Sequence, residues 1–240
     1  MNIIRNVFRS SLGKKYVMAV TGFVLFLFVI GHLVGNLQIF IGREAINRYG
    51  AFLQSNLELL WPVRVVLLAV VGLHIWSAIT VSLENNAARP LDYEVYQPFG
   101  STYASRTMLV GGLIVLVFIV YHLLHYTAQV QYLNLTGQNF KAFMELLPGH
   151  IPPERHDIYK MMVVGFSNYW VSGFYVLGLA LLCLHLSHGA SSMFQSLGWR
   201  NDAYRPFLDK AAVVVAVLIF IGYTSIPVAI LCGYGKEVLK

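Results

Sequence analysis

The chain has 240 residues, of which 57% are hydrophobic and only 12% are charged, and its mean hydropathy is +0.63. A soluble domain carries about twice that charged fraction, so the composition excludes an ordinary soluble protein. The formal net charge of +6 comes from basic residues scattered among polar connections, which favours anchoring beside a membrane over nucleic-acid binding. We therefore predict an all-α membrane protein that forms a single domain over residues 1–240.

Five apolar stretches are long enough to cross a bilayer, which takes ~20 residues of α-helix. In chain order they are Lys15–Phe40, Trp61–Leu83, Arg106–Val130, Tyr169–Gln195 and Asp209–Leu231. Trp61-Pro62 is typical of a helix start, because proline is tolerated in the first turn and tryptophan favours the membrane interface. The chain is therefore expected to cross the membrane five times.

The connections between these stretches give an orientation. Four basic residues precede the first stretch (Arg5, Arg9, Lys14 and Lys15), which predicts a cytoplasmic N-terminus. The polar inner connection, Glu84–Ser105, is then a contact surface for a partner. In the outer connection, Gln131–Asn168, the apolar residues Phe140, Phe143, Leu146 and Leu147 predict a short helix that lies on the membrane.

Six of the eight histidines fall within the predicted spans. They are His32, His74, His122, His125, His185 and His188. Counted along the helices, His32 and His122 lie ~25 Å from the inner surface, and His74 and His185 lie ~15 Å from it. Four helices thus deliver two histidine pairs at two depths, about 10 Å apart along the membrane normal.

Two neutral imidazoles that face each other in an apolar bundle can act as the axial ligands of a haem iron. Ligation also offsets the cost of burying each histidine, which as a single residue would be expected to serve packing alone. Small residues near these positions could leave room for a porphyrin, although close helix packing explains them equally well. They are Gly31, Gly35, Gly72, Ala78, Gly178 and Gly189.

His125 and His188 each follow a proposed ligand by three residues and are expected on nearly the same helix face. Each lies nearer its own membrane surface than the ligand does, where a haem propionate would point. We therefore expect His125 and His188 to bond propionates. In the alternative, His125 and His188 are the ligands and the other histidines support them.

Several segments resemble the single-chain cytochrome b558 subunit of succinate dehydrogenase and fumarate reductase. The resemblance rests on SSLGKKYVMAVTGFVLFLFVIGHLVGNLQIF, ARPLDY, ASRTM, FIVYHLLHYT, HDIYKMMVVGFSNYW and LHLSHGASSMFQSLGW. It covers the first four predicted spans and the connections between them. It implies five helices, four of which surround two stacked b-type haems, in a bacterial inner membrane. It also implies docking onto an iron–sulfur subunit that carries a flavoprotein, where succinate is oxidised, and a menaquinone or ubiquinone as redox partner.

The ligands of that family fall on four histidines of this chain. The resemblance implies that His32 and His122 bind the outer haem iron and that His74 and His185 bind the inner one. The pairing agrees with the pairing by depth. A mild departure is Ala190-Ser191, which stands where a bulkier apolar-aromatic pair is expected and could alter packing beside the inner haem.

A quinone that exchanges electrons and protons needs an apolar slot beside a haem and a group that moves protons. Glu44 and Glu58 stand near the outer haem level, and Glu58 is the preferred candidate. The inner alternatives are Ser10, Ser11, Lys14 and Lys15. The outer site is favoured, because two haems at different depths are useful only if electrons cross the membrane.

Three other classes of protein fit parts of this pattern. A proton-coupled transporter also places histidines in membrane helices, but it would usually add intramembrane carboxylates. Other dihaem cytochromes b tend to take two ligands from one helix. A haem-free structural anchor is the third alternative. An absorption spectrum separates the haem proteins from the rest.

Overall fold

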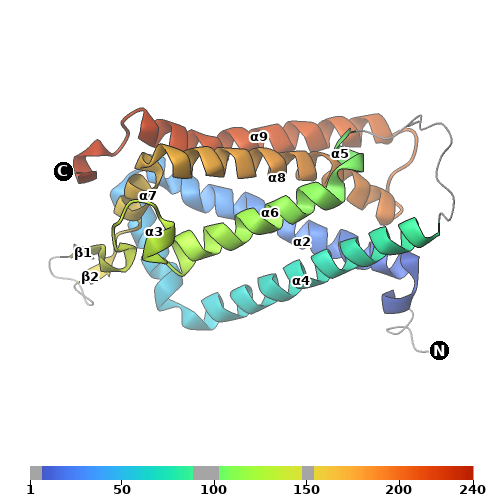
Figure 1. The fold of residues 1–240 in the computed structure, drawn as a ribbon, viewed down its shortest axis with the longest axis horizontal. Helices are drawn as coiled ribbons and strands as arrows, with labels where there is room; N and C mark the ends of the chain where they lie inside the picture. Colours follow the sequence, from blue (N-terminus) through green and yellow to red (C-terminus); the bar gives the residue numbers. More distant parts are fainter. Residues whose placement is uncertain (1–6, 89–102, 148–153, 240) are drawn as a thin grey trace. The chain divides into compact units, whose positions relative to one another are not determined.

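The computed structural model of the chain describes residues 7–88, 103–147 and 154–239. In this part of the chain, five helices are long and apolar enough to cross a membrane (Figure 1). They are α2 (Ser11–Leu37), α4 (Leu57–Ala87), α6 (Met108–His122), α8 (Tyr169–Ser196) and α9 (Arg205–Leu231). A 3-10 turn, η1 (Gln38–Phe40), extends α2, and a π-helical turn, η2 (Leu123–Thr127), extends α6. The five predicted apolar helices are present, and their ends differ from the predicted bounds by four residues at most. These five helices indicate a multi-pass membrane protein.

The start of α4 differs from the sequence prediction. Helix α3 (Arg43–Ser55) ends at Asn56, and the Asn56 carbonyl accepts from the amides of Leu59 and Leu60 at 3.0 and 2.9 Å. A new helix therefore begins at Leu57, before Trp61, and Pro62 lies inside it. The prediction that Trp61-Pro62 starts the helix is wrong, because the asparagine carbonyl begins the helix one turn earlier.

The chain divides into two compact units. Unit 1 comprises Met1–Val29, Val63–Leu113 and Cys183–Val217, and unit 2 comprises Ile30–Pro62, Ile114–Leu182 and Leu218–Lys240. Every long helix contributes segments to both units. Neither unit is therefore a separate stretch of sequence, and the single domain over residues 1–240 stays a prediction.

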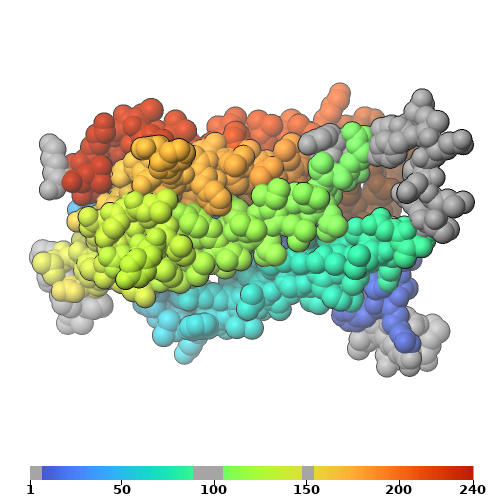
Figure 2. Space-filling model, in the orientation of Figure 1, coloured from blue at the N-terminus to red at the C-terminus, as the bar shows by residue number. Residues whose placement is uncertain are grey.

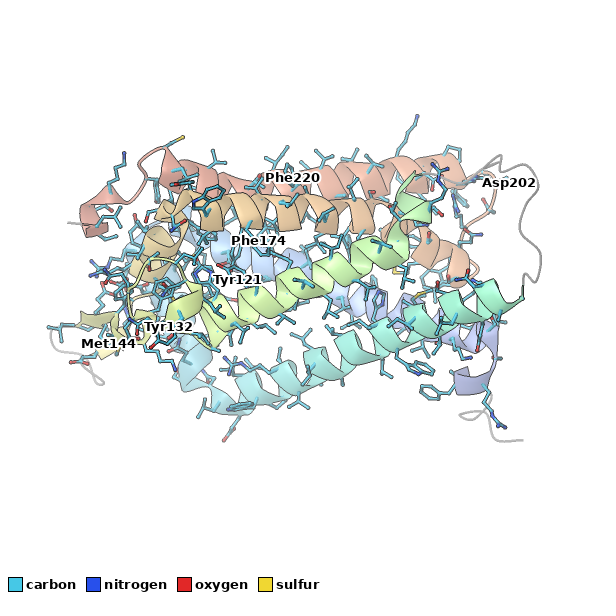
Figure 3. All side chains as sticks on the ribbon, in the orientation of Figure 1. Tyr121, Tyr132, Met144, Phe174, Asp202 and Phe220 are labelled. Atoms are coloured by element: carbon cyan, nitrogen blue, oxygen red, sulfur yellow. The ribbon has the colours of Figure 1, made fainter. Side chains whose placement is uncertain are left out.

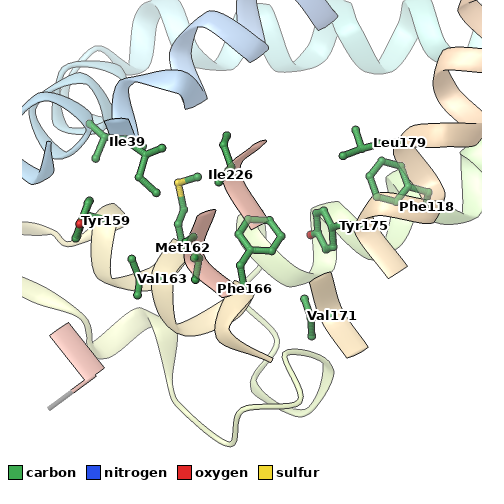
Figure 4. Close-up of a cluster of buried hydrophobic side chains, with 12 residues drawn as sticks. Ile39, Phe118, Tyr159, Met162, Val163, Phe166, Val171, Tyr175, Leu179 and Ile226 are labelled. Atoms are coloured by element: carbon green, nitrogen blue, oxygen red, sulfur yellow. The ribbon is translucent and has the colours of Figure 1, made fainter. Parts of the chain in front are cut away.

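Unit 2 holds a buried apolar cluster of twelve residues (Figure 4). Its members come from η1, α3, α6, α8, α9 and a short helix α7 (Ile158–Ser167) that is buried along most of its length. They are Ile39, Ile46, Phe118, Tyr159, Met162, Val163, Phe166, Val171, Tyr175, Leu179, Ile226 and Ile230. Burial of this apolar surface, at ~25 cal/mol per Å², holds α7 in place.

The outer connection folds differently from its prediction. It forms two 3-10 turns, η3 (Gln131–Leu133) and η4 (Phe140–Ala142), and a hairpin of β1 (Met144–Leu146) with β2 (Glu154–His156). Phe140 is fully buried against Met161 and Val164. The helix predicted to lie on the membrane is therefore absent from the described part of this connection, because Phe140 packs inward and the residues after it pair as a strand. In the space-filling view, the yellow-green connection forms a continuous mass with the end of α6 (Figure 2).

A polar cluster joins this connection to α3. It consists of Arg43, Glu44, Asn47, Glu145, Arg155 and Asp157. The Arg155 Nε donates to Glu145 at 2.8 Å, and Asn47 Nδ2 lies 2.9 Å from oxygens of both Glu145 and Asp157. Hydrogen bonds to Glu44 and Glu145 raise the pKa of the Arg155 guanidinium. Asp157 and Asn47 are buried, so the Asp157 carboxylate and the Asn47 side-chain amide need these hydrogen-bond partners.

Candidate functional site

The six predicted histidines lie in the described helices, and four of them meet in pairs. In unit 2, His32 of α2 faces His122 of α6 with ring centroids 5.8 Å apart and planes at 78°. In unit 1, His74 of α4 faces His185 of α8 at 6.3 Å and 72°. The two predicted pairs are thus brought together, while their role as ligands stays a prediction.

The spacing of both pairs fits two imidazoles on one metal. A bond from a transition metal to an imidazole nitrogen is about 2.0–2.1 Å and the ring centre lies ~1.1 Å further on, so two axial rings have centres ~6.2 Å apart. The observed 5.8 and 6.3 Å agree with that value. Residues 7–88, 103–147 and 154–239 hold no group of three or more His, Cys, Asp or Glu side chains suited to a bare metal ion. Two imidazoles do suit a metal whose other four ligands come from a macrocycle.

His74 has the hydrogen bonds expected of a metal-binding imidazole. Its Nδ1 lies 3.1 Å from the Met18 carbonyl oxygen and 3.1 Å from Thr21 Oγ1. A carbonyl oxygen can only accept, so Nδ1 carries the proton and Nε2 keeps its lone pair. Thr21 donates its own hydrogen to the Val17 carbonyl, which leaves its oxygen free to accept from His74. Such partners fix both the tautomer and the ring orientation of a ligand.

Two glycines that the sequence prediction did not name allow the unit 1 pair to fit between helices. A Cβ atom on Gly22 would lie 3.2 Å from His74 Cε1, and one on Gly112 would lie 3.4 Å from His185 Cε1. The histidine of one helix thus rests on a glycine of its neighbour. The sequence shows a glycine in each of these two apolar stretches, but it does not show which histidine of another helix lies against that glycine.

The small residues that the sequence did indicate divide into two kinds. A Cβ on Gly178 would lie 2.4 Å from Phe118, and one on Gly35 would lie 2.9 Å from Tyr49, so these glycines serve helix packing. A Cβ on Gly31 or Gly72 would have no neighbour within 4 Å. Both glycines are exposed, so the space beside them does not test the prediction of room for a porphyrin.

Aromatic side chains surround the unit 2 pair. The His122 ring lies 6.1 Å from the ring of Tyr126, 6.0 Å from Tyr175 and 6.3 Å from Phe118. Tyr121 and Phe174, which are labelled in Figure 3, pack against each other with ring centroids 4.8 Å apart. Tyr175 Oη also lies 3.4 Å from His122 Nδ1. Sequence reasoning missed Tyr175, although a tyrosine inside an apolar helix usually has a polar partner.

His125 and His188 do not belong to the facing pairs. His125 is fully buried, packs against Tyr126 at 4.1 Å and Phe140 at 5.5 Å, and contacts Tyr175 Oη through Nδ1 at 2.9 Å. His188 Nε2 lies 2.9 Å from Ser192 Oγ on its own helix. These positions favour the pairs made by His122 and His185 over the alternative in which His125 and His188 are the ligands.

The π-helical turn η2 explains why His125 diverges from His122. The Ala128 amide bonds to the Leu123 carbonyl, five residues back, at 2.7 Å. A π turn is wider than an α turn, so residues three apart no longer share one face. The prediction that His125 lies on nearly the same face as His122 assumed α geometry, which ends at His122.

The carboxylates considered for quinone chemistry lie in unit 2, as the His32–His122 pair does. Glu44 forms the ion pair with Arg155 described above, whereas Glu58 is exposed in the first turn of α4.

The inner alternatives for the quinone site lie in unit 1. Ser10 Oγ accepts from the Gly13 amide at 3.0 Å, and buried Lys14 pairs with Glu84. Ser11 begins α2 and Lys15 lies in its first turn. The contact loop predicted at Glu84–Ser105 lies for the most part outside the described residues.

The fold and site together define a helical protein with five membrane-length helices and two facing imidazole pairs, each built from two different helices. In comparisons with known proteins, no family model, no curated protein and no solved structure matches the chain. A proposed function therefore rests on the motifs of the sequence and on the geometry of the two pairs.

Proposed function

We propose that this chain is the dihaem cytochrome b membrane anchor of a succinate:quinone oxidoreductase. The observation that carries the proposal is that His32 meets His122 and His74 meets His185, each from a different helix, at centroid spacings of 5.8 and 6.3 Å, which would let both imidazoles of a pair hold one iron. Each pair would hold one haem b without a covalent bond. The cysteines support this, because neither Cys183 nor Cys232 lies in the CxxCH motif of covalent attachment.

A haem that is bound by two histidines supplies one-electron chemistry, and the chain supplies its binding and its surroundings. The four histidines hold the metal through neutral nitrogens. Met18 and Thr21 keep the proton of His74 on Nδ1, so that Nε2 stays available. The apolar helices exclude water and keep the surroundings low in polarity, which is one of the factors that set a haem potential.

The resemblance of the motifs to cytochrome b558 supports the proposed partners. An iron–sulfur subunit, which carries the flavoprotein that oxidises succinate, would dock on the cytoplasmic side of a bacterial inner membrane. Electrons would enter near the inner pair and leave to a membrane quinone near the outer pair. Cross-links to the iron–sulfur subunit should then come from the N-terminal arm, the Glu84–Ser105 loop and the Gln195–Asp209 loop. Cross-links mainly from the outer connection would invert this topology.

For the quinone, Glu58 is the better of the two outer carboxylates. Glu44 is already held by Arg155, so it could take up a proton only by giving up that ion pair. An open surface hollow between η1 and α3 is lined by Gln38, Ala45, Arg48, Tyr49 and Phe52. Its amide, guanidinium and phenol groups could donate to quinone carbonyls, and it lies in the same unit as the His32–His122 pair.

The decisive experiment is a haem count. Pyridine haemochrome analysis of the purified chain, set against protein mass, should give two haem b per chain. If two histidines hold each iron, the oxidised protein should also give the EPR signals of low-spin ferric haem. A chain that binds no haem would reject the proposal and leave a proton-coupled transporter or a haem-free anchor.

A further inference from the structure

Tyr175 of α8 is the one side chain found within hydrogen-bond distance of both His122 and His125 in the described part of unit 2. Its Oη lies 2.9 Å from His125 Nδ1 and 3.4 Å from His122 Nδ1. The Tyr175 ring is buried and packs edge-on against Phe166 at 5.0 Å and Phe118 at 5.4 Å, as Figure 4 shows. The hydroxyl group is therefore held at a fixed place between the two imidazoles.

A phenol has a single hydrogen and an oxygen that can accept, so three arrangements of these two contacts are possible. In the first, His122 donates to Tyr175 and Tyr175 donates to His125, and in the second both bonds run the other way. In the third, both imidazoles donate to the Tyr175 oxygen, which leaves the phenol hydrogen without an acceptor among the described residues. The second arrangement places a proton on Nε2 of His122 and prevents ligation through that nitrogen. Of the two arrangements that use the phenol hydrogen, only the first is compatible with His122 as a metal ligand.

The far end of the relay agrees with a fixed direction. His125 Nε2 is buried and has no hydrogen-bond partner among the described residues, and the same holds for the neighbouring Tyr126 hydroxyl. With Tyr175 donating to Nδ1, His125 presents an N–H group at Nε2. The two rings are in contact, with centroids 4.1 Å apart, and each carries one buried polar group that can donate to a ligand acceptor.

We propose that Tyr175 is a positioning residue that fixes the tautomer of His122 and tunes the outer redox centre through the relay His122–Tyr175–His125. This inference rests on the proposed function, because it needs His122 to bind the iron. A hydrogen bond donated by the distal nitrogen raises the basicity of a ligand and so favours the oxidised metal. Loss of the Tyr175 hydroxyl should therefore raise the midpoint potential of the outer centre and leave the inner centre unchanged.

The test is a spectroscopic redox titration of Tyr175→Phe in the membrane-embedded protein. The substitution removes one oxygen and keeps the packed ring. We expect both haems to be retained. At a given potential, the ratio of reduced to oxidised outer centre should rise about tenfold, which corresponds to a rise of 59 mV in its midpoint potential for one electron. His125→Phe should shift it in the same direction but less, because the Tyr175 oxygen can still accept from His122.

Tyr121→Phe is the matched control. Tyr121 lies in the same aromatic group, 5.9 Å from the Tyr175 ring, but its hydroxyl donates to the Leu133 carbonyl at 3.0 Å. An equal shift in Tyr121→Phe, or an unchanged potential in Tyr175→Phe with two haems present, would overturn the inference. Loss of the outer haem in Tyr175→Phe would also overturn it, since a positioning residue leaves the ligand bound. Absence of haem from the unsubstituted chain would instead reject the proposed function.

Discussion

The two histidine pairs have similar ring spacing but different surroundings. In unit 1, His74 donates to a backbone carbonyl, Met18, and rests on a glycine. In unit 2, His122 meets the side-chain hydroxyl of Tyr175 within a group of aromatic rings. A carbonyl can only accept, whereas a hydroxyl can accept and donate. The main chain therefore holds His74 of unit 1 in one protonation pattern, whereas His122 of unit 2 depends on a side chain that a single substitution can change. Nδ1 of His185 is buried and has no hydrogen-bond partner among the described residues.

The largest expected effect comes from removal of one member of a pair. His74→Ala or His185→Ala should reduce the haem count from two to one and remove only the inner centre, because one imidazole cannot replace the other. His32→Ala or His122→Ala should remove only the outer centre. Haem content and the potentials of the remaining centre measure the result. Loss of both centres from one substitution would mean that the pairs are not independent.

A second prediction separates the pairs by task. Glu58→Gln should slow quinone turnover about a hundredfold, the size of one acid–base group, while both haems and succinate oxidation with a soluble dye survive. Glu44→Gln is the second choice. If Lys15→Ala or Ser11→Ala abolishes quinone turnover and neither glutamate matters, the quinone binds beside the unit 1 pair, and the assignment of tasks is reversed.

The third prediction concerns the polar cluster of unit 2 that joins α3 to the outer connection. Asp157 accepts from Arg43, Asn47 and the Lys160 amide, and its side chain is 1% exposed. Asp157→Ala should cost about 2–3 kcal/mol in the free energy of unfolding, since it leaves buried partners unsatisfied. On heating in detergent, the outer centre should be lost at a lower temperature than the inner one.

The control for this substitution is Glu154→Gln, on the same hairpin but exposed, which should change stability by less than ~0.5 kcal/mol. Equal loss of both centres in Asp157→Ala would show that the two units unfold together.

The smallest expected effect is in unit 1. Thr21→Val keeps the shape of the side chain but removes the oxygen 3.1 Å from His74 Nδ1. Because the Met18 carbonyl still accepts a hydrogen bond from the same N–H group, the ratio of reduced to oxidised inner centre at a given potential should change about twofold at most. A shift as large as that expected for Tyr175→Phe would remove the distinction between a main-chain and a side-chain partner.

The sequence predicts the parts of this fold that depend on local composition. Five long apolar stretches become five helices, since length and hydropathy alone decide whether a segment can cross a bilayer. The meeting of His32 with His122 and of His74 with His185 follows from counting residues along straight helices. Both predictions use only the rise per residue and the position of polar neighbours.

What the sequence does not predict depends on contacts between distant segments. Phe140 looks like part of an amphipathic surface helix, but it is buried against residues of α7. Arg155 meets Glu44 across 111 positions of the chain, and no local pattern announces that pair. The relay through Tyr175 depends on a π turn after His122, which changes the direction of His125 and has no reliable sequence signature.

Each histidine pair takes its members from alternate long helices, α2 with α6 and α4 with α8. A chain that grows from its N-terminus inserts His32 and His74 before either has a partner. The His32–His122 pair can form once α6 has entered the membrane, whereas the His74–His185 pair must wait for α8. If each pair holds a haem as proposed, the inner site would therefore be loaded later than the outer one, and a chain arrested before α8 would lack His185 and also the Tyr175 hydroxyl beside His122.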